Sequence, residues 1–257
     1  MKPKIIDCFT FYNEVQMLEF RLEELGEFVD FFVIVEANKT FVGLEKEKNF
    51  PEQNKIVQKY IDKIVYVFVD DMPDGDDPWE REAHQRNCII RGLDKISPDN
   101  DDIVIISDCD EVFDIETIKL LTDHGIDKFN GFVCLEQDMY YYNIETKAKN
   151  KWYHPKVCLY SNLKNFSTID DLRLSRCNFV IRDGGWHFSY FGGVDMIKNK
   201  INNFSHQEFN NSKFTDELRI NEAIEKSIDL FRRDGIEYFS IDTDDNEYLP
   251  KNYKMLV

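Results

Sequence analysis

The segment of this sequence best suited to chemistry is Ser107-Asp108-Cys109-Asp110-Glu111, which continues directly from the apolar run IVIIS at 103–107. Three carboxylates within four positions repel one another unless a cation, water or protonation relieves the repulsion. On an extended segment, Asp108 and Asp110 point to the same side. Such oxygen ligands suit Mg²⁺ or Mn²⁺, ions that commonly bridge to a diphosphate. This D-x-D pattern predicts a metal and diphosphate site, with a solvated acidic loop as the alternative.

Polar donors precede this segment on the helix expected at 78–96. Arg81 and Gln85 are four positions apart and therefore share one helical face. A phosphate or base beside the metal would accept hydrogen bonds from such residues, and above all from arginine. We assign Arg86 and Asn87 to donor binding, whereas a surface charge that offsets nearby acids explains Arg81 equally well.

A third candidate is the glycine- and aromatic-rich segment GGWHFSY at 184–190. Its two glycines permit close backbone approach, and its rings offer a stacking surface for a sugar or base. We expect a turn here that displays His187 as a neutral-imidazole metal ligand; the alternative is a hydrogen-bonded core histidine. His206 is a weaker candidate. The tyrosines at 140–142 are expected to line an acceptor groove, although sheet packing explains at least one of them.

Polar residues stand at the ends of the first two expected strands, Asn13-Glu14 after the first and Glu36 at the end of the second. Glu36 ends the run FFVIVE, and a carboxylate at the end of a second parallel strand can accept hydrogen bonds from ribose hydroxyls. We therefore assign Glu36 to the donor. Asn13 is explained by helix capping, with Gln16 three positions later completing a capping box.

The elements that must position these residues alternate in type along the first 125 residues. Short apolar runs that predict buried strands are separated by amphipathic stretches that predict helices: strands at 4–9, 31–36, 64–69 and 103–107, and helices at 13–26, 51–62 and 78–96. This alternation predicts an α/β fold with a mostly parallel sheet covered on both faces. In such sheets, ligands collect beyond the carboxyl ends of the strands, where the acidic segment falls.

The second half is less regular. Strands are expected at 131–143, 156–161 and 178–182, and helices at 193–204 and 215–231. Because the sequence contains neither a linker rich in Pro, Gly and Ser nor an internal repeat, we predict one domain over 1–257. About 1–125 would bind a nucleotide and about 126–257 an acceptor.

The composition of the chain argues against some classes of function. The 257 residues include 32 Lys+Arg and 49 Asp+Glu, a net charge of 32 − 49 = −17, which argues against general nucleic-acid binding. Apolar runs fall short of the ~18–20 residues that span a bilayer, and the start of the chain lacks a signal-peptide pattern. Six scattered cysteines without a C-x-x-C pair predict reduced, mostly buried thiols. We therefore expect a soluble cytoplasmic protein.

Several motifs together resemble glycosyltransferase family 17, the group that includes the enzyme adding the bisecting β-1,4-linked N-acetylglucosamine to the core mannose of N-glycans. Six stretches carry the resemblance, in the family's order, from near residue 5 to about residue 211: IIDCFTFYNEVQMLEFRLEEL, FVIVEANKTFVG, WEREAHQRNCIIRGL, IVIISDCDEV, GGWHFSYFGG and INNFSHQEFN. Six ordered matches are far more specific than a D-x-D pattern alone.

The resemblance implies a GT-A-type, Rossmann-like three-layer fold and an inverting transfer from a UDP-sugar, with N-acetylglucosamine the expected sugar, to a carbohydrate acceptor. It places Mn²⁺ or Mg²⁺ and the diphosphate at Asp108 and Asp110, with His187 as a late metal ligand. The ion and Arg86 would neutralise the charge that develops on the leaving UDP.

Inversion also needs a carboxylate that takes the proton of the acceptor hydroxyl. Asp171, Asp183 and Glu208 stay open for this role, and Asp183 is favoured because it adjoins the GGWH segment. Two other functions compete with glycosyl transfer. A nucleotidyltransferase would consume a nucleoside triphosphate, and a non-catalytic carbohydrate-binding module would bind glycan without metal or nucleotide.

Overall fold

A computed structural model describes residues 2–129 and 131–257. Its larger sheet has seven strands in the order β10-β6-β9-β4-β1-β2-β3. Their bounds are β1 Ile5–Thr10, β2 Phe31–Ala37, β3 Ile64–Val69, β4 Ile103–Asp108, β6 Phe132–Leu135, β9 Lys156–Leu159 and β10 Val180–Ile181. β9 runs antiparallel to its two neighbours, and the other pairs are parallel. The predicted mostly parallel sheet is confirmed.

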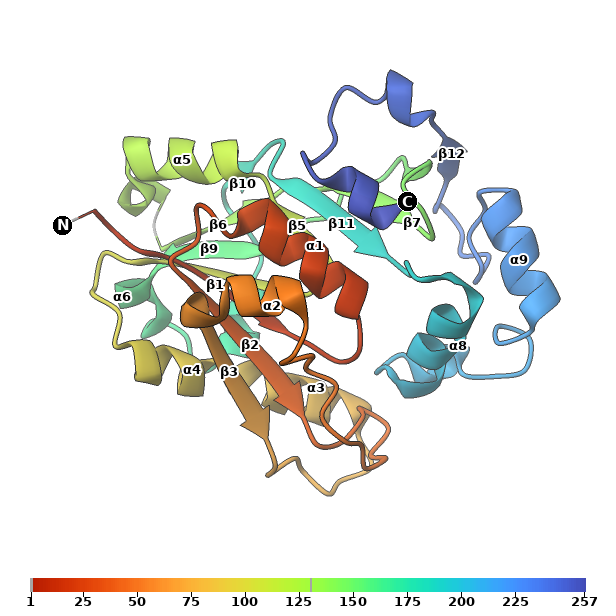
Figure 1. Ribbon diagram of the computed structural model, residues 1–257, viewed down its shortest axis with the longest axis horizontal. Coiled ribbons are helices and arrows are strands. Elements are labelled where there is room, and N and C mark those ends of the chain that lie inside the picture. Colours follow the sequence, from red (N-terminus) through yellow and green to blue (C-terminus); the bar gives the residue numbers. More distant parts are fainter. Residues whose placement is uncertain (1, 130) are drawn as a thin grey trace.

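Helices cover both faces of this sheet, as the alternation of elements predicts. Along β1, Ile5 and Phe9 pack toward α1, whereas Ile6 and Cys8 pack toward α4. α1 (Val15–Leu25) and α2 (Lys55–Lys59) lie on one face, in front in Figure 1. The opposite face carries α3 (Pro78–Asn87), α4 (Ile89–Ile96) and α7 (Ile169–Leu174). The result is a three-layer α/β sandwich.

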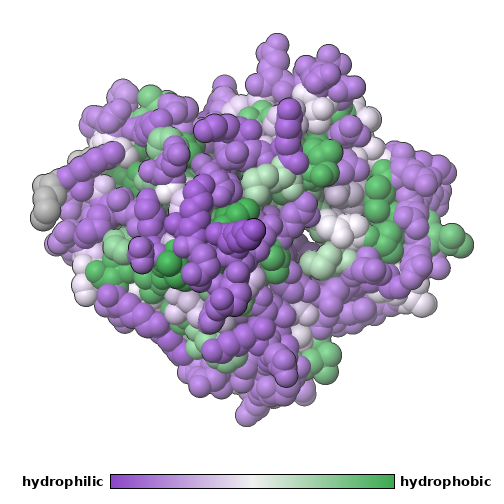
Figure 2. Space-filling model, viewed as in Figure 1, coloured by the Kyte–Doolittle hydropathy of each residue, from purple (hydrophilic) through white to green (hydrophobic). Residues whose placement is uncertain are grey.

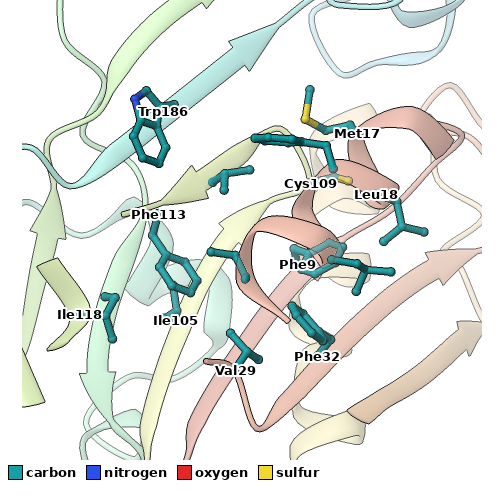
Figure 3. Packing of buried hydrophobic residues seen from close by; sticks show 14 of the residues in the cluster. Phe9, Met17, Leu18, Val29, Phe32, Ile105, Cys109, Phe113, Ile118 and Trp186 are labelled. Atoms are coloured by element: carbon teal, nitrogen blue, oxygen red, sulfur yellow. The ribbon is translucent and has the colours of Figure 1, made fainter. Parts of the chain in front are cut away.

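A second sheet of five strands has the order β12-β8-β7-β11-β5. Its bounds are β5 Glu111–Phe113, β7 Asp138–Tyr141, β8 Thr146–Ala148, β11 Gly185–Ser189 and β12 Tyr238–Ser240. One apolar core is shared by both sheets, and Figure 3 shows Trp186 and Phe113 in the same cluster as Phe9, Phe32 and Leu18. The segment 107–111, called the acidic turn below, leads from β4 of the first sheet into β5 of the second.

The remaining helices lie mainly in the second half. They are α5 (Ile115–His124), α6 (Tyr160–Leu163), α8 (Gly193–Asn203) and α9 (Glu217–Glu225), with short 3-10 helices η1 (Ile61–Lys63), η2 (Ile126–Phe129), η3 (Gln207–Phe209), η4 (Thr243–Asp245) and η5 (Tyr253–Leu256). α8 and α9 stand at one side of the molecule in Figure 1, beside the end of β11. Their apolar residues pack against Tyr141 of β7 and against Tyr142 and Tyr190, which directly follow β7 and β11.

Several predicted element boundaries are wrong. The helix expected at 78–96 is divided at Cys88, and the strand expected at 131–143 is two strands, β6 and β7, in different sheets. α2 begins after Asn54, whose side chain accepts hydrogen bonds from the backbone N–H groups of the first turn. The capping box is also wrong, because Glu14 is the N-cap of α1 and the Asn13 amide donates to Asn199 instead.

The prediction of six reduced cysteines is wrong for one pair. Cys134 of β6 and Cys177, which follows α7, form a disulfide with their Cα atoms 5.9 Å apart. The other four cysteines are free and buried within the described residues. Among the helices that the structure describes, none is both long and apolar enough to cross a membrane.

A buried arginine ties α1 to the acidic turn. Arg21 is fully buried and binds both carboxylate oxygens of Asp7 on β1, at 2.6 and 2.8 Å. It also donates to Ser107 Oγ at 2.6 Å and to three carbonyl oxygens of the turn, those of Asp108, Cys109 and Glu111, at 2.8–3.1 Å. Burial alone would lower the pKa of Arg21, but the charge of Asp7 outweighs it and raises that pKa.

A second buried cation, Lys156, has its pKa lowered and not raised. Lys156 begins β9, is 3% exposed, and donates to the carbonyls of Tyr153 and His154 at 3.3 and 2.9 Å. Burial, and then the charge of Arg173, lower the pKa of Lys156 to about 8. Because the unfolded chain keeps an ordinary lysine pKa near ~10.4, the unfolded state binds more protons between these two values.

We expect Arg21→Met to destabilise the fold by about 3–5 kcal/mol, because Asp7 would remain buried without its counter-charge. Urea unfolding followed by circular dichroism measures this loss. Lys59→Met is the matched control, since Lys59 pairs with Glu23 at the surface, and its midpoint should stay near that of the wild type. An Arg21→Met protein as stable as the control would contradict the structural role of the network.

Stability should also depend on pH through Lys156. Since the unfolded state binds more protons between about pH 8 and 10.4, the free energy of unfolding gains a positive slope with pH in that window. Lys156→Met removes this contribution. The free energy of unfolding of the variant minus that of the wild type should therefore fall, by on the order of 3 kcal/mol, between pH 7 and pH 10.4. A difference that is constant over this range would contradict the buried-lysine assignment.

Candidate active site

The acidic turn lies at the carboxyl ends of β1 and β4, and protein cations already pair with its first carboxylate. Asp108 accepts hydrogen bonds from Arg173 of α7 at 2.9 Å and from Arg86 of α3 at 3.3 Å. Burial works to raise the pKa of Asp108, but the charges of Arg173 and Arg86 outweigh it and hold the pKa well below its ordinary value. Asp108 is therefore ionised and held in place from two helices.

Glu111 is the buried member of the turn. Its carboxylate accepts hydrogen bonds from Arg173 Nη1 at 2.8 Å, from the Trp152 indole, and from the backbone N–H of Asp108 at 2.9 Å. With 1% of its surface exposed, Glu111 is out of reach of a ligand. Its function is to hold Arg173 and the backbone of the turn.

Asp110 faces a different group of partners. Its Oδ2 lies 2.9 Å from the ammonium of Lys200 on α8, and its Oδ1 lies 3.7 Å from Nε2 of His187 on β11. Burial opposes ionisation of Asp110, but Lys200 and His187 outweigh it and hold the pKa of Asp110 far below its ordinary value. The carboxylate predicted to bind metal is thus paired with an imidazole and an ammonium.

The segment that carries His187 is a buried strand, so the predicted turn is wrong. β11 pairs with β5 and β7, and its glycine Gly185 allows close strand packing, because a Cβ there would lie 2.2 Å from the carbonyl oxygen of Val112. Trp186 packs against Tyr248 in the core and offers no stacking surface. His187 still reaches the site, because its side chain points to Asp110 from the middle of the strand.

The chemistry of this pair suits a divalent ion. A carboxylate oxygen and an imidazole nitrogen 3.7 Å apart can share one ion, and Mn²⁺ accepts both ligand types. The buried Nδ1 of His187 also has no hydrogen-bond partner among the described residues. Both oxygens of Asp108, the third predicted ligand, are bound by arginines, and its part in metal binding stays a prediction.

A different group has the closest ligand atoms. Within the described parts of the chain, Asp71, His84 and Cys88 are the one set of three whose ligand atoms all lie within 4.8 Å of one another. Arg91 binds both carboxylate oxygens of Asp71, at 2.7 and 2.8 Å. This second group therefore already contains a cation and lies outside the acidic turn.

Two hollows lie around Glu14 and Lys200, and Asp110 lines the first of them. The first, called the cleft below, has a volume of about 270 Å³ and lies between the start of α1, the end of β11 and α8; Asp110, Tyr190 and Leu256 line it. Figure 2 shows a hollow right of centre on this face. The second, called the side pocket, has about 90 Å³ and is lined by residues that follow β1 and β2. Glu14 and Lys200 line both hollows.

The predicted donor-binding residues on α3 serve mainly internal contacts. Arg86 is buried and binds Glu82, Asp170 and Asp108, while the Asn87 side chain accepts the backbone N–H of Asp170. Arg86 therefore reaches the acidic turn as predicted, but Asn87 positions α7 instead of facing the cleft.

Three other assignments need correction. Glu36 is fully buried, and its carboxylate accepts hydrogen bonds from the backbone N–H groups of Asn49 and Phe50 and from the side chains of Tyr66 and Lys46. It therefore holds a loop and is not exposed to a nucleotide-sugar. The tyrosines at 140–142 are core residues, each 5% exposed or less. Arg81 binds carbonyl oxygens of two loops and is not a surface charge.

The structure does not bring the favoured base to the acidic turn. Asp183 is exposed, four residues before His187, which corresponds to about 13 Å along an extended chain. Asp171 and Glu208 are also exposed, and Glu208 pairs with His206 at 2.7 Å. Glu14, by contrast, lines the cleft, with its carboxylate accepting the N–H groups of Tyr12 and Asn13 at 3.1 and 3.0 Å.

The residues that sequence reasoning missed are Arg21, Arg173 and Lys200, whereas Glu14 is singled out beside Asn13 but without a role. Arg173 and Lys200 are 62–90 positions from the carboxylates they bind, so no spacing links them. Arg21 leaves one signal, because it interrupts the apolar stripe of Leu18, Leu22 and Leu25 on α1.

Comparisons with known proteins show similarity to parts of this chain. Two curated relatives, the β-1,4-mannosyl-glycoprotein 4-β-N-acetylglucosaminyltransferases of Rattus norvegicus and Homo sapiens, are each 32% identical to it over 117 residues. That match covers 42% of this chain but only 21% and 22% of the relatives, about a fifth of their length.

Two solved structures match this chain with lower sequence identity. A 4-diphosphocytidyl-2C-methyl-D-erythritol synthase matches with a TM-score of 0.42 and 14% identity, over 72% of this chain and 90% of that chain. Residues 1–349 of S. aureus TarS match with a TM-score of 0.43 and 15% identity, over 87% and 73%. The family comparison is more extensive, since the model described as Glycosyltransferase family 17 matches residues 1–241. The chain belongs to glycosyltransferase family 17.

Proposed function

We propose that this glycosyltransferase is metal-dependent and inverting, and that it transfers a sugar, N-acetylglucosamine by analogy with its relatives, from a UDP-sugar to a carbohydrate acceptor. The observation that carries the proposal is the convergence of Asp110, His187 and Lys200 beyond the carboxyl ends of parallel strands, where Asp110 and Lys200 line the cleft. Residues 1–125 would contribute most of the donor side and residues 126–257 most of the acceptor side.

In this proposal Asp110 and His187 hold the divalent ion, which when bound neutralises charge on the leaving diphosphate. Asp108 stays ionised between Arg86 and Arg173 and is placed to bind a donor hydroxyl or a metal-bound water. The side pocket, with Phe11, Tyr12 and the Gln85 amide in its lining, would receive the nucleoside.

The acceptor hydroxyl needs a carboxylate to remove its proton on the face opposite the leaving group. Glu14 and Asp110 are the carboxylates in the described lining of the cleft. Because Asp110 is assigned to the ion, we assign the base to Glu14. Two backbone N–H groups orient this carboxylate, which keeps it aimed while a substrate binds.

A donor screen tests the reaction class. Release of UDP from common UDP-sugars should require Mn²⁺ or Mg²⁺, and Asp110→Asn should reduce it by at least ~100-fold, since a charged ligand is lost. Asp71→Asn, which alters the second group of potential ligands, should retain activity. Consumption of nucleoside triphosphates alone would favour a nucleotidyltransferase, and metal-independent glycan binding without turnover would favour a binding module.

A second pair of variants tests the base. Glu14→Gln keeps an oxygen that can accept the two N–H groups, so binding of Mn²⁺ and UDP should persist while transfer falls by about 10²–10⁴-fold. Asp183→Asn is the comparison and should stay active. The reverse pattern, an inactive Asp183→Asn and an active Glu14→Gln, would return the role to Asp183. Initial rates with the donor identified by the screen, and UDP titrations, give both readouts.

A further inference from the structure

Lys200 is the residue of α8 that reaches the acidic turn. Its ammonium lies 2.9 Å from Asp110 Oδ2 and 5.1 Å from the ring centroid of Tyr190. Met196, Lys200 and Asn203 follow one another at helical spacing, and they present one face of α8 to the cleft and the side pocket. Lys200 lines both hollows, so it stands where a molecule extending from one into the other must pass.

The ammonium binds Oδ2 of Asp110, next to Oδ1, the oxygen that faces His187 and would bind the ion. One carboxylate with an ammonium at hydrogen-bond distance has little remaining charge to offer an ion, and the two cations would repel each other at such short range. Binding of the ion therefore requires Lys200 to leave Asp110. The flexible four-carbon stem of lysine allows this without unfolding the helix, and its side chain is already 31% exposed.

A displaced ammonium beside a bound ion needs a new anionic partner. The diphosphate of a nucleotide donor supplies one, because it must lie next to the same ion and bridge the two hollows that Lys200 lines. The arginines beside the acidic turn are less free to move, because Arg86 is buried and binds Glu82 and Asp170, and Arg173 is buried and binds the buried Glu111.

We propose that Lys200 exchanges partners: it neutralises Asp110 in the free protein, and it binds the donor diphosphate once a divalent ion has taken Asp110. The proposal rests on the proposed function, which supplies the diphosphate. It assigns to one side chain two opposite effects, competition with the ion and attraction of the nucleotide, and this combination distinguishes it from a structural lysine.

The test compares Lys200→Met with Lys198→Met. Lys198 is on the same helix, is equally exposed at 31%, and pairs with Glu217 away from the cleft. Calorimetry gives the affinity for Mn²⁺ without nucleotide and then the affinity for UDP at saturating Mn²⁺. We expect Lys200→Met to bind Mn²⁺ roughly 10-fold more tightly and UDP roughly 10-fold more weakly, the scale of one charge-assisted hydrogen bond. Lys198→Met should match the wild type in both.

Each other result overturns the proposal in an identifiable way. Weaker binding of both Mn²⁺ and UDP by Lys200→Met would make Lys200 a structural residue, and unchanged UDP binding would remove its diphosphate role. Failure of Lys200→Arg to restore UDP binding would show that the positive charge is not what matters. A wild-type protein that binds Mn²⁺ but no UDP would refute the donor assignment, and the diphosphate role with it, whereas wild-type binding of both tests Lys200 alone.

Discussion

The site depends on the buried contact between Arg21 and Asp7. A turn with several carboxylates would tend to move out into water. The buried guanidinium of Arg21 prevents this, because it donates hydrogen bonds to three backbone carbonyl oxygens of the turn. With the carbonyls directed inward, the side chains of Asp108 and Asp110 are left to point outward. The same arginine fixes the path from β4 to β5, and therefore the way in which one sheet follows the other.

Charge balance in this region is supplied by the chain itself. Asp108 and Glu111 are neutralised by arginines from α3 and α7, and Asp110 by a lysine from α8. The repulsion that the sequence suggests is thus already relieved without a metal. Arg86 and Arg173 each bind more than one carboxylate, whereas removal of Asp110 would leave Lys200 without its carboxylate partner. Asp110 therefore contributes to charge balance as well as to any part in catalysis.

Strong local patterns made half of the fold predictable. The strands at β1–β4 follow from apolar runs long enough to be buried on both faces, and the acidic turn follows from its position after one of them. His187 lies next to Asp110, but on a strand and not on the predicted turn, because the glycines of its segment permit strand packing as readily as a turn. Whether it binds metal stays a prediction.

What the sequence could not supply is long-range placement. The sequence pattern around Glu36 and Glu111 does not show that these residues are buried. In the structure each carboxylate accepts hydrogen bonds from segments distant in the sequence. The division of 131–143 between two sheets depends on where β9 and β11 pair, which local propensity does not encode. Lys200 and Arg173 meet the turn only because α7 and α8 return to the same end of the sheet.

The strand order also has a consequence for biosynthesis. β9 lies between β4 and β6, although both of these precede it in the chain. As the chain leaves the ribosome, the β3-β2-β1-β4 unit can assemble early, but one edge of β4 remains unpaired until residues 156–159 emerge. That edge belongs to the apolar strand IVIISD and is a template for pairing with another nascent chain. During the synthesis of the roughly 50 residues between β4 and β9, this apolar edge is therefore open to pairing with other chains.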